Sequence, residues 1–585
     1  MPSPLCEFRL PPPRWEMPQQ DPDVAADLQR ELPVSRLCAI ALARRGATTP
    51  ALANAFLNPR LANLQDPWRF RDMDRAVERV VRALKANENI CIYGDFDADG
   101  ITATALLARF FRELGVPART FLPDRLRDGY GLQRERLLQL RADGATLFIA
   151  VDCGTRSHDE AAALRDSGAD LIVLDHHIPG PTLPDVVALV NPFRPDCTFP
   201  FKGLASVGIA FYFAGAVRRA LIREGLLAED RLDLRSFLGL VAVGTVADVV
   251  PLLQDNRILV HAGLEALNRE PDPGFAALRV VAGVADRPVT TGVLGFQIGP
   301  RLNAIGRLGD ATAALDLLIA RDVEEAARLA TVLDQENSAR RRIEVEVLEE
   351  VLRRVQSDGG PAHRIIVAAG AGWHPGVVGI VAARLVEAFH RPAVVIGVND
   401  GIGRGSCRSV PGFDIGQAVC SLQPLLLRAG GHALAAGLTI EESRIDEFRR
   451  ALQDLADREV PEDLLVPRLR VEAIAEPPEL TLDLVAQLQA LQPHGVGNPE
   501  PVFALIAVRV VEVRRVGRAE DHLQITFERD GVRLPAIWWG GATGEFVPAN
   551  DDLVDVAFTL ALDERRRTPR LKVRDVRRAA MEGGS

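Results

Sequence analysis

Short, largely apolar segments alternate with segments of helical periodicity through the first half of the chain. The apolar segments occupy residues 90–93, 119–122, 145–151, 171–174 and 186–190. Strands that are apolar at nearly every position are typical of sheets covered on both faces, and strand–helix alternation is typical of parallel sheets. We therefore predict a parallel-sheet α/β domain at residues 86–320.

Four further parts flank this domain. Residues 1–85 alternate helical segments with prolines, which predicts an N-terminal helical extension. Apolar residues recur every four positions from Ala339 to Val355 without glycine or proline, so residues 321–360 are expected to hold one long helix connecting two domains. Residues 361–458 again combine strand and helix patterns, and residues 465–580 carry five short strand patterns separated by turn residues, typical of a small β-barrel.

Acidic and histidine side chains follow the predicted parallel strands. Their positions are Asp95, Asp97 and Asp99 after the first apolar segment, Asp152 after the third, and Asp175, His176 and His177 after the fourth; Asp248 interrupts an apolar helical segment. The carboxyl ends of parallel strands share one edge of the sheet, where α/β proteins place their ligands. We therefore expect these side chains to converge.

Carboxylates this close together repel one another unless a cation lies among them. A calcium loop of the EF-hand type is excluded, because no glutamate follows Gly100 at the required spacing and a strand precedes the loop. A solvated acidic turn remains the alternative for this segment. Oxygen ligands with some imidazole suit Mn²⁺ or Mg²⁺, and the number of acids favours two ions. Two-metal sites are typical of phosphoester hydrolysis, which is the chemistry we predict.

Composition narrows the class of protein. A formal net charge of -10 over 585 residues excludes a uniformly basic nucleic-acid coat, so any polyanion must meet a local basic patch. The seven cysteines form no CxxC pair, which argues against a disulfide framework or a cysteine zinc site and favours a reducing, cytoplasmic location. The longest apolar stretch is too short to span a bilayer, so we expect no membrane segment.

Several motifs resemble a known family. Asp175-His176-His177, with Asp95-Phe-Asp97-Ala-Asp99-Gly100 upstream, is similar to the DHH phosphoesterase superfamily. Residues 121–131, 151–154, 244–248, 300–307, 430–437 and 495–501 extend the resemblance to the RecJ family of single-stranded-DNA exonucleases. The resemblance implies a DHH domain joined by the long helix to an α/β DHHA1 domain, followed by an OB-like β-barrel.

The resemblance also implies an activity and a set of site residues. It implies a 5′→3′ exonuclease that hydrolyses single-stranded DNA with two Mn²⁺ or Mg²⁺ ions, in DNA repair and recombination. The implied metal ligands are Asp97, Asp99, Asp152, His176 and Asp248, with Asp152 between the two ions and Asp95 as a further ligand or supporting acid. His177 is implied to contact the scissile phosphate. Tyr93 stands where some superfamily members have a histidine ligand.

A second set of residues is implied to bind the DNA strand. Arg404, Ser406, Arg408 and Ser409, with Gly430, Gly431 and His432, suit a 5′-phosphate pocket, although a solvated loop and a tight turn are the alternatives. Arg301, Asn303 and Arg307 are expected along the strand path. Tyr130 either stacks on a base or packs in the core. In the barrel, Trp538, Trp539 and the basic residues from Arg565 to Arg574 suit a DNA strand, with one tryptophan expected in the core.

Two rival functions remain open. A DHH phosphodiesterase could instead act on short RNA oligomers or cyclic dinucleotides, although such relatives generally lack the C-terminal barrel. A binding or scaffold protein is the third possibility, but it should have lost some of the ligands. Besides single-stranded DNA, the family resemblance suggests a helicase and a single-strand-binding protein as partners, and the chain is expected to be a monomer.

Overall fold

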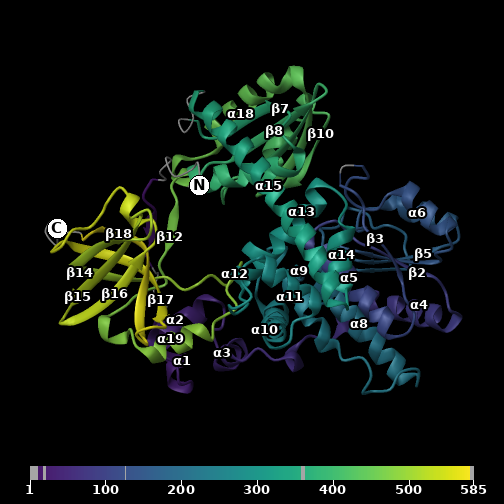
Figure 1. Cartoon of the computed structure of the whole chain (residues 1–585), viewed down its shortest axis with the longest axis horizontal. Coiled ribbons are helices and arrows are strands. Elements are labelled where there is room, and N and C mark those ends of the chain that lie inside the picture. The colour runs from purple at the N-terminus through teal and green to yellow at the C-terminus, as the bar shows by residue number, and fades with distance from the viewer. Residues whose placement is uncertain (1–10, 18–21, 126, 358–362, 580–585) are drawn as a thin grey trace. The chain divides into compact units, whose positions relative to one another are not determined.

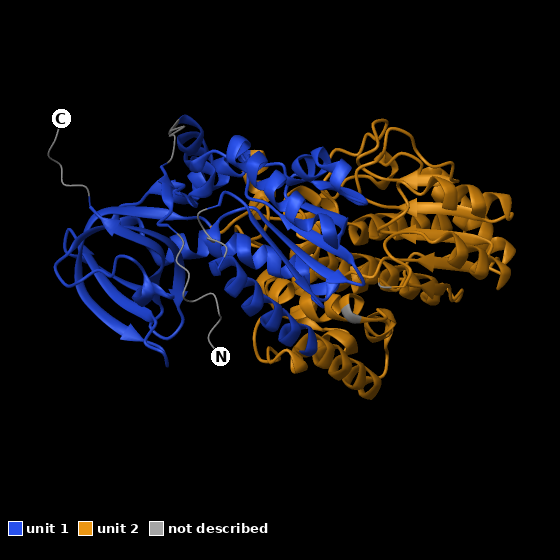
Figure 2. Cartoon of the chain, turned by 90° about the horizontal axis from the view of Figure 1, so that it is seen from above, with its two compact units in different colours: residues 1–50, 339–490, 501–585 blue, residues 51–338, 491–500 orange. Residues whose placement is uncertain are grey.

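The computed structural model describes residues 11–17, 22–125, 127–357 and 363–579. The chain divides into two compact units, coloured separately in Figure 2. Unit 2 comprises residues 51–338 and 491–500, and unit 1 comprises residues 1–50, 339–490 and 501–585. Figure 1 labels their helices and strands.

Unit 2 is built on a five-stranded sheet with all strands parallel, in the order β3-β2-β4-β5-β6. The strands are β2 (Ile90–Tyr93), β3 (Arg119–Phe121), β4 (Leu147–Val151), β5 (Asp170–Leu174) and β6 (Ala188–Val190). Alternate residues point to opposite faces, so that Ile149 joins one hydrophobic core and Phe148 the other. Burial on both faces explains the apolar strands, and the predicted parallel sheet is confirmed.

Helices cover both faces of this sheet. The core that contains Ile149 includes α4 (Met73–Ala86), α5 (Ala98–Glu113), α8 (Ser206–Arg223) and α9 (Leu238–Ala247). The core that contains Phe148 includes α6 (Arg134–Ala142) and α7 (His158–Asp166). The remaining helices of unit 2 are α3 (Pro50–Leu57), α10 (Gln254–Arg269), α11 (Pro273–Val281), α12 (Thr291–Val293), a π-helical turn (Leu294–Ile298), α13 (Gly299–Leu308) and α14 (Thr312–Ile319).

The long helix is α15 (Val323–Ser357), as its glycine-free pattern predicts. It begins in unit 2 and continues into unit 1. A second segment also belongs to unit 2 although its neighbours in sequence do not. In this loop of residues 491–500, Asn498 is fully buried and its amide donates to the carbonyl oxygens of Leu491 and Pro493. The loop also accepts a hydrogen bond at Val496 from the backbone of Leu252, four residues after Asp248.

The α/β part of unit 1 contains a five-stranded mixed sheet in the order β10-β11-β9-β8-β7. Its strands are β7 (Ile366–Ala371), β8 (Ala393–Asn399), β9 (Ile402–Arg408), β10 (Arg428–His432) and β11 (Ala435–Glu441). Helix α15 and α16 (Pro375–Phe389) pack on one face, while α17 (Ile415–Ser421) and α18 (Ile445–Glu459) pack on the other. The second α/β domain predicted from the sequence is therefore confirmed.

The C-terminal part of unit 1 is a closed β-barrel. Its five strands are β14 (Phe503–Val516), β15 (His522–Arg529), β16 (Val532–Trp538), β17 (Leu553–Asp563) and β18 (Thr568–Arg578). Pairing of β14 with β17 closes the ring, and β13 (Ala473–Ile474) adds to β14 outside it. Closure leaves no free strand edge within the ring. The barrel predicted from five strand patterns is confirmed.

The N-terminal region differs from the expected run of helices. Helices α1 (Pro22–Glu31) and α2 (Arg36–Arg44) are present, but β1 (Arg14–Glu16) precedes them and pairs in parallel with β12 (Arg468–Arg470). Trp15 packs against the barrel and donates its indole N–H to Asp575 at 2.7 Å. The sequence did not predict β1, because the segment is proline-rich and its partner strand lies more than 400 residues away. Helix α19 (Leu482–Gln489) follows β12 in this unit.

Within the described residues, no helix is both long and apolar enough to cross a membrane.

Candidate metal centre and nucleic-acid-binding residues

The loop between β2 and α5 brings three carboxylates to the sheet edge. Asp97 caps α5, and its carboxylate accepts hydrogen bonds from the backbone N–H groups of Asp99 and Gly100 at 3.0 and 3.1 Å. A Cβ atom at Gly100 would lie 2.6 Å from the backbone nitrogen of Asp95. Glycine therefore permits the tight fold of the loop, which directs acidic side chains toward the end of the sheet.

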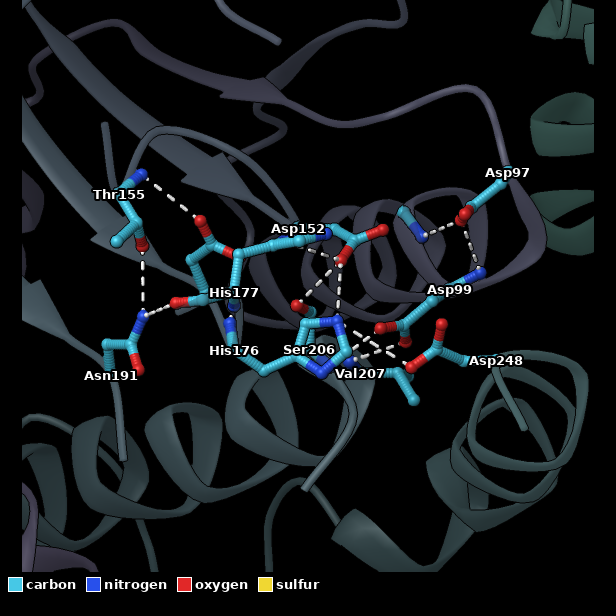
Figure 3. Close-up of polar contacts among 12 residues, drawn as sticks. Asp97, Asp99, Asp152, Thr155, His176, His177, Asn191, Ser206, Val207 and Asp248 are labelled. Carbon is cyan, nitrogen blue, oxygen red and sulfur yellow. Dashed lines mark hydrogen bonds and ion pairs between the residues drawn. The ribbon is translucent and has the colours of Figure 1, made fainter. Parts of the chain in front are cut away.

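The N-terminus of α8 holds the next two acids (Figure 3). Asp99 is buried and accepts hydrogen bonds from the backbone N–H groups of Ser206 and Val207 at 2.7 and 2.9 Å. Asp152, directly after β4, accepts from the Ser206 hydroxyl at 2.9 Å. Its backbone is left-handed, with φ +63°, a conformation that Asp and Asn tolerate better than most residues. One serine thus fixes two carboxylates through its backbone and its side chain.

His176 lies between carboxylates from two different elements. Its Nε2 atom is 3.5 Å from Asp152 Oδ1 and 3.6 Å from Asp248 Oδ2. Asp248 follows the last residue of α9, as its C-cap, rather than interrupting the helix as expected from the sequence. Burial, followed by the neighbouring His177, lowers the pKa of His176, which favours the neutral form that can act as a metal ligand.

His177 is oriented by a buried carboxylate. Its Nδ1 atom lies 2.7 Å from Asp175 Oδ1, and Asp175 also accepts the backbone N–H of Thr155 at 3.1 Å. Burial opposes ionisation of Asp175, but the contact with His177 outweighs it and lowers the pKa of this carboxyl. Burial likewise lowers the pKa of His177, yet the bond to Asp175 raises it overall. His177 is therefore the more readily protonated of the two adjacent histidines.

Tyr130 lies at the site and not in the core. It is 56% exposed, and its hydroxyl is 3.2 Å from His177 Nε2. The same hydroxyl donates to the backbone carbonyl of Asp152 at 3.4 Å. The exposed ring excludes the core-packing alternative for Tyr130. Tyr93, in contrast, is fully buried and donates its hydroxyl to the carbonyl of Gly131 at 3.3 Å.

The acids repel one another in a dry environment. Burial, then the nearby Asp97, raises the pKa of Asp99 to about 7, and burial, then Asp99, raises the pKa of Asp248 to about 9. The pKa values of Asp95 and Asp152 are also raised well above their usual range, first by burial and then by neighbouring aspartates. Such a cluster is unfavourable in its ionised form unless positive charge is present.

The donor set fits divalent ions. Three groups have ligand atoms within 4.8 Å of one another: Asp95, Asp97 and Asp152; Asp99, His176 and Asp248; and Asp152, His176 and His177. Over the part of the chain that is described, Asp95 Oδ1 and Asp248 Oδ2 are buried oxygens without a hydrogen-bond partner. Unsatisfied buried oxygens are costly, and a hard cation satisfies them. Asp152 and His176 each belong to two groups, so the residues can hold two ions that share ligands.

Helix α13 borders a cavity of about 190 Å³ beside these acids. Asn303 and Arg307 line it together with Arg125, and Asn303 accepts the backbone N–H of Ala98 at 2.7 Å. A Cβ atom at Gly306 would lie 2.3 Å from the carbonyl oxygen of Phe96, so this glycine lets α13 approach the acidic loop. Two positive side chains thus lie beside an acidic cluster.

Residues of the second α/β domain form what we call the basic face. Period-two alternation places Arg404, Ser406 and Arg408 of β9 on one side of the sheet. In the strand register, Ser406 of β9 pairs with Gly437 of β11, which pairs in turn with Gly430 of β10. In the same way, Arg408 pairs with Ala435, which pairs with His432. Arg428 of β10 aligns with Arg404 in the same way. The basic face therefore consists of Arg404, Ser406, Arg408, Arg428, Gly430, Gly437 and His432.

The glycines of the basic face leave open space above the backbone. A Cβ atom at Gly430 would meet no heavy atom within 4 Å, and at Gly437 it would meet a single backbone oxygen at 3.9 Å. Gly431 has φ +155°, and a Cβ atom there would lie 2.4 Å from the Cα atom of Ala436. This glycine therefore permits the close pairing of β10 with β11 and adds no open space. An anion can approach the sheet closely between flanking arginines.

Two expected strand-binding residues have other contacts. Arg301 is buried, and its guanidinium donates to Asp334 at 2.9 Å and to the carbonyl of Gln297 at 2.6 Å. Ser409 is also buried, and its hydroxyl donates to the carbonyl of Phe413 at 2.7 Å. The structure gives both side chains contacts inside the fold, and the expected roles of Arg301 on the strand path and of Ser409 in the 5′-phosphate pocket stay predictions.

The barrel presents the expected aromatic and basic side chains. Trp539 is 63% exposed and contacts His522 with ring centroids 4.7 Å apart. Trp538 is half-buried against the turn at Gly541, so neither tryptophan is a core residue, contrary to expectation. On β18, the exposed Lys572 and Arg574 alternate with the buried Leu571 and Val573. The turn before β18 exposes the three consecutive arginines 565–567.

Sequence reasoning missed several residues of the site. Ser206 joins Asp99 to Asp152, and Arg125 lines the acid-bordered cavity. Asn191 donates to the carbonyl of His177 at 2.8 Å and to the Thr155 hydroxyl at 2.9 Å. The position of Asn191 directly after β6 was a usable signal, since it repeats the strand-end pattern of the acids. Ser206 carried no such signal.

Family models match three parts of the chain. The DHH family, N-terminal domain, matches residues 89–245, the DHHA1 domain matches residues 362–457, and the RecJ OB domain matches residues 471–575. The single-stranded-DNA-specific exonuclease RecJ of Escherichia coli is 35% identical over 574 residues, covering 95% of this chain and 98% of that protein. The chain belongs to the RecJ family of single-stranded-DNA-specific exonucleases.

Other RecJ proteins agree with this assignment. RecJ of Bacillus subtilis is 34% identical over 568 residues, covering 96% of this chain and 70% of that protein. A crystal structure of RecJ from Thermus thermophilus in complex with Mn²⁺ matches with a TM-score of 0.82 and 31% identity, covering 98% of this chain and 81% of that chain. A second structure of the same protein, in complex with Mg²⁺, matches with a TM-score of 0.76. The RecJ fold therefore extends over nearly the whole chain.

Proposed function

We propose that the chain is a metal-dependent exonuclease that hydrolyses single-stranded DNA in the 5′→3′ direction, in DNA repair and recombination. The observation that carries the proposal is the convergence of carboxylates and imidazoles at the sheet edge, where Asp95 and Asp248 each have a buried oxygen without a hydrogen-bond partner. Family membership supplies the substrate class, and the RecJ structures with Mn²⁺ and Mg²⁺ support these ions as cofactors.

We assign roles to the acidic residues on the basis of their grouping. Asp95, Asp97 and Asp152 would hold one ion, while Asp99, His176 and Asp248 would hold the other. Asp152 lies within reach of both sites through His176, which supports a bridging role. Bound divalent ions supply Lewis acidity at phosphorus and lower the pKa of a bound water.

The chain's own residues orient the phosphodiester. Asp175 holds His177 by its Nδ1 atom and favours the protonated ring, which can neutralise a phosphate oxygen. Arg125 and Arg307 add positive charge at the adjoining cavity. Ser206 keeps Asp99 and Asp152 in place, so the carboxylates need not move when the substrate enters.

The basic face is the proposed anchor for the 5′-phosphate. Arg404 and Arg408 flank an open glycine floor, and Ser406 lies between them on the same face of β9. Anchoring of a terminal phosphate would explain 5′→3′ polarity, because a 3′-hydroxyl end has no terminal phosphate to anchor.

Replacing Arg408 with alanine should weaken the preference for 5′-phosphorylated strands. Loss of one charge-assisted contact is expected to raise KM for a 5′-phosphorylated strand by about 10- to 100-fold, with little change for a 5′-hydroxyl strand. Arg450→Ala is the matched control, because Arg450 is an exposed arginine on α18, which covers the opposite face of the sheet. If the ratio of KM for 5′-hydroxyl strands to KM for 5′-phosphorylated strands is the same in the wild type and in Arg408→Ala, Arg408 does not bind the 5′-phosphate.

The test of the proposed function is digestion of end-labelled single-stranded DNA with Mn²⁺, Mg²⁺ or chelator. Mononucleotides should appear from the 5′ end in the presence of metal, and duplex DNA and RNA should be spared. Preferential cleavage of short RNA oligomers or cyclic dinucleotides would overturn the substrate assignment.

Further parts of the proposal concern the setting of the enzyme. We propose a monomer in the cytoplasm, working with a helicase that supplies single strands and a single-strand-binding protein. We also propose that residues 86–320, 361–458 and 465–580 act as catalytic, substrate-anchoring and strand-binding domains, with residues 321–360 as the connection and residues 1–85 as an extension.

A further inference from the structure

Phe296 has no explanation in the fold. Its side chain is 75% exposed, the largest fraction of any large apolar side chain within the described part of the chain. It lies in the π-helical turn Leu294–Ile298, immediately before α13. Turns of this type are rare and are frequent at functional sites. Neither metal binding nor phosphate binding requires a phenyl ring in water at this position.

Close packing fixes this turn beside the candidate metal centre. Cβ atoms at Gly295 and Gly299 would lie 3.7 Å from Val246 and 3.3 Å from Ala247, at the end of α9. Asp248 follows directly, and Ala247 itself lines the cavity shared with Asn303. The helix axis from residue 296 to residue 303 measures about 10 Å. The first few nucleotides of a strand whose end reaches the acids can therefore span the distance to residue 296.

A second exposed apolar side chain follows Asp248. Val249 is 65% exposed and has φ +61°, a conformation that β-branched residues rarely adopt. We call Phe296 and Val249 the apolar ledge. Both adjoin the end of α9, one through the packed π-helical turn and one through the chain itself.

The chemistry of the apolar ledge selects its ligand. Residues 291–300 carry no charged side chain, so the ledge does not suit a phosphate or an acidic peptide. Two side chains cannot supply the roughly 800 Å² per partner that a stable protein interface buries. A nucleobase offers a flat π-surface of matching size, and aromatic residues bind single strands by stacking without regard to sequence.

We propose that Phe296, supported by Val249, stacks on a base of the single strand a few nucleotides behind the scissile bond. This inference rests on the proposed single-stranded-DNA substrate and adds a specific contact to it. Stacking there holds the strand by its base while Arg125 and Arg307 face its phosphates. A paired base cannot offer its face in this way, so the ledge also disfavours duplex DNA.

The test compares Phe296→Ala with wild type on single strands of increasing length, from a dinucleotide upward. KM should rise by about 5- to 150-fold once the strand is long enough to reach the ledge, the range of one stacked base. The ratio should be the same at low and high salt, because stacking releases no counterions. KM for the dinucleotide should not change, and Phe296→Trp should restore wild-type KM on long strands.

Two controls make the result specific. Leu226→Ala removes another exposed apolar side chain, beyond the end of α8, a helix about 27 Å long whose first turn holds Asp99. An abasic nucleotide moved stepwise along the strand should abolish the effect of Phe296→Ala at one position. The proposed stacking would be wrong if Phe296→Ala raised KM no more than Leu226→Ala does. It would also be wrong if the effect of Phe296→Ala were the same at all strand lengths and all abasic positions. Failure of the wild type to cleave any single strand would overturn the proposed function instead.

Discussion

Replacing Asp152 with asparagine should reduce hydrolysis of single-stranded DNA by about 10³-fold or more, while DNA binding survives. Asp152 belongs to two of the three potential metal-binding groups, so its loss disturbs both ions at once. Asparagine keeps the left-handed backbone at φ +63° and can still accept the hydrogen bond of Ser206. Single-turnover cleavage in Mn²⁺, with binding followed by fluorescence anisotropy, measures the two quantities separately.

A buried acid outside the metal groups provides the control for this substitution. Asp255 is also buried and accepts the Tyr212 hydroxyl at 2.7 Å, but it belongs to none of the three groups. Asp255→Asn should lower thermal stability and leave the rate constant of the folded enzyme near that of the wild type. Wild-type cleavage by Asp152→Asn would show that the acids do not act as metal ligands.

The metal-free protein should lose stability as pH rises from about 5 to 9. The folded pKa values of Asp99 and Asp248, about 7 and about 9, lie above the value of about 3.9 expected for an unfolded aspartate. The folded state therefore holds more protons, so its extra stability is complete below pH ~4 and is lost as pH passes each folded pKa.

Divalent ions should reverse this loss. Mn²⁺ binds the ionised carboxylates and displaces the protons that the metal-free carboxyls still hold, so the increase in Tm on adding Mn²⁺ should grow with pH over the same window. Differential scanning fluorimetry with and without chelator checks both slopes. Asp248→Asn should flatten the metal-free slope, because an amide has no proton to lose. A metal-free Tm that rises from pH 5 to pH 9 would contradict the raised pKa values.

The acidic cluster was predictable because a parallel sheet has simple geometry. Each strand that ends in an acid delivers it to the same edge, whatever the lengths of the intervening helices. This reasoning applies to Asp97, Asp152 and His176, which the structure brings together. It does not apply to Ser206, because the approach of the α8 N-terminus depends on helix packing across the whole domain.

The directions of the expected DNA-binding side chains were harder to predict for similar physical reasons. Arg301 and Arg307 both belong to α13, but the directions of their side chains depend on which face of the helix packs, through its glycines, against the acidic loop. Ser409 directly follows β9, and period-two alternation continued by one residue separates it from Ser406 once the segment is treated as a strand. Its glycine content suggested a loop instead, and a loop has no fixed period.

The chain passes between its two units at residues 50, 338, 490 and 500. A stop codon after Ala490 would therefore remove more than the barrel, because residues 491–500 belong to unit 2 and contact the segment that follows Asp248. The shortened enzyme would lack the buried Asn498 loop beside its own catalytic edge. Weak cleavage by such a truncated enzyme would have two causes at once, the loss of the barrel and the loss of the loop of residues 491–500. Point substitutions on the barrel surface, such as Lys572→Ala, isolate the contribution of strand binding.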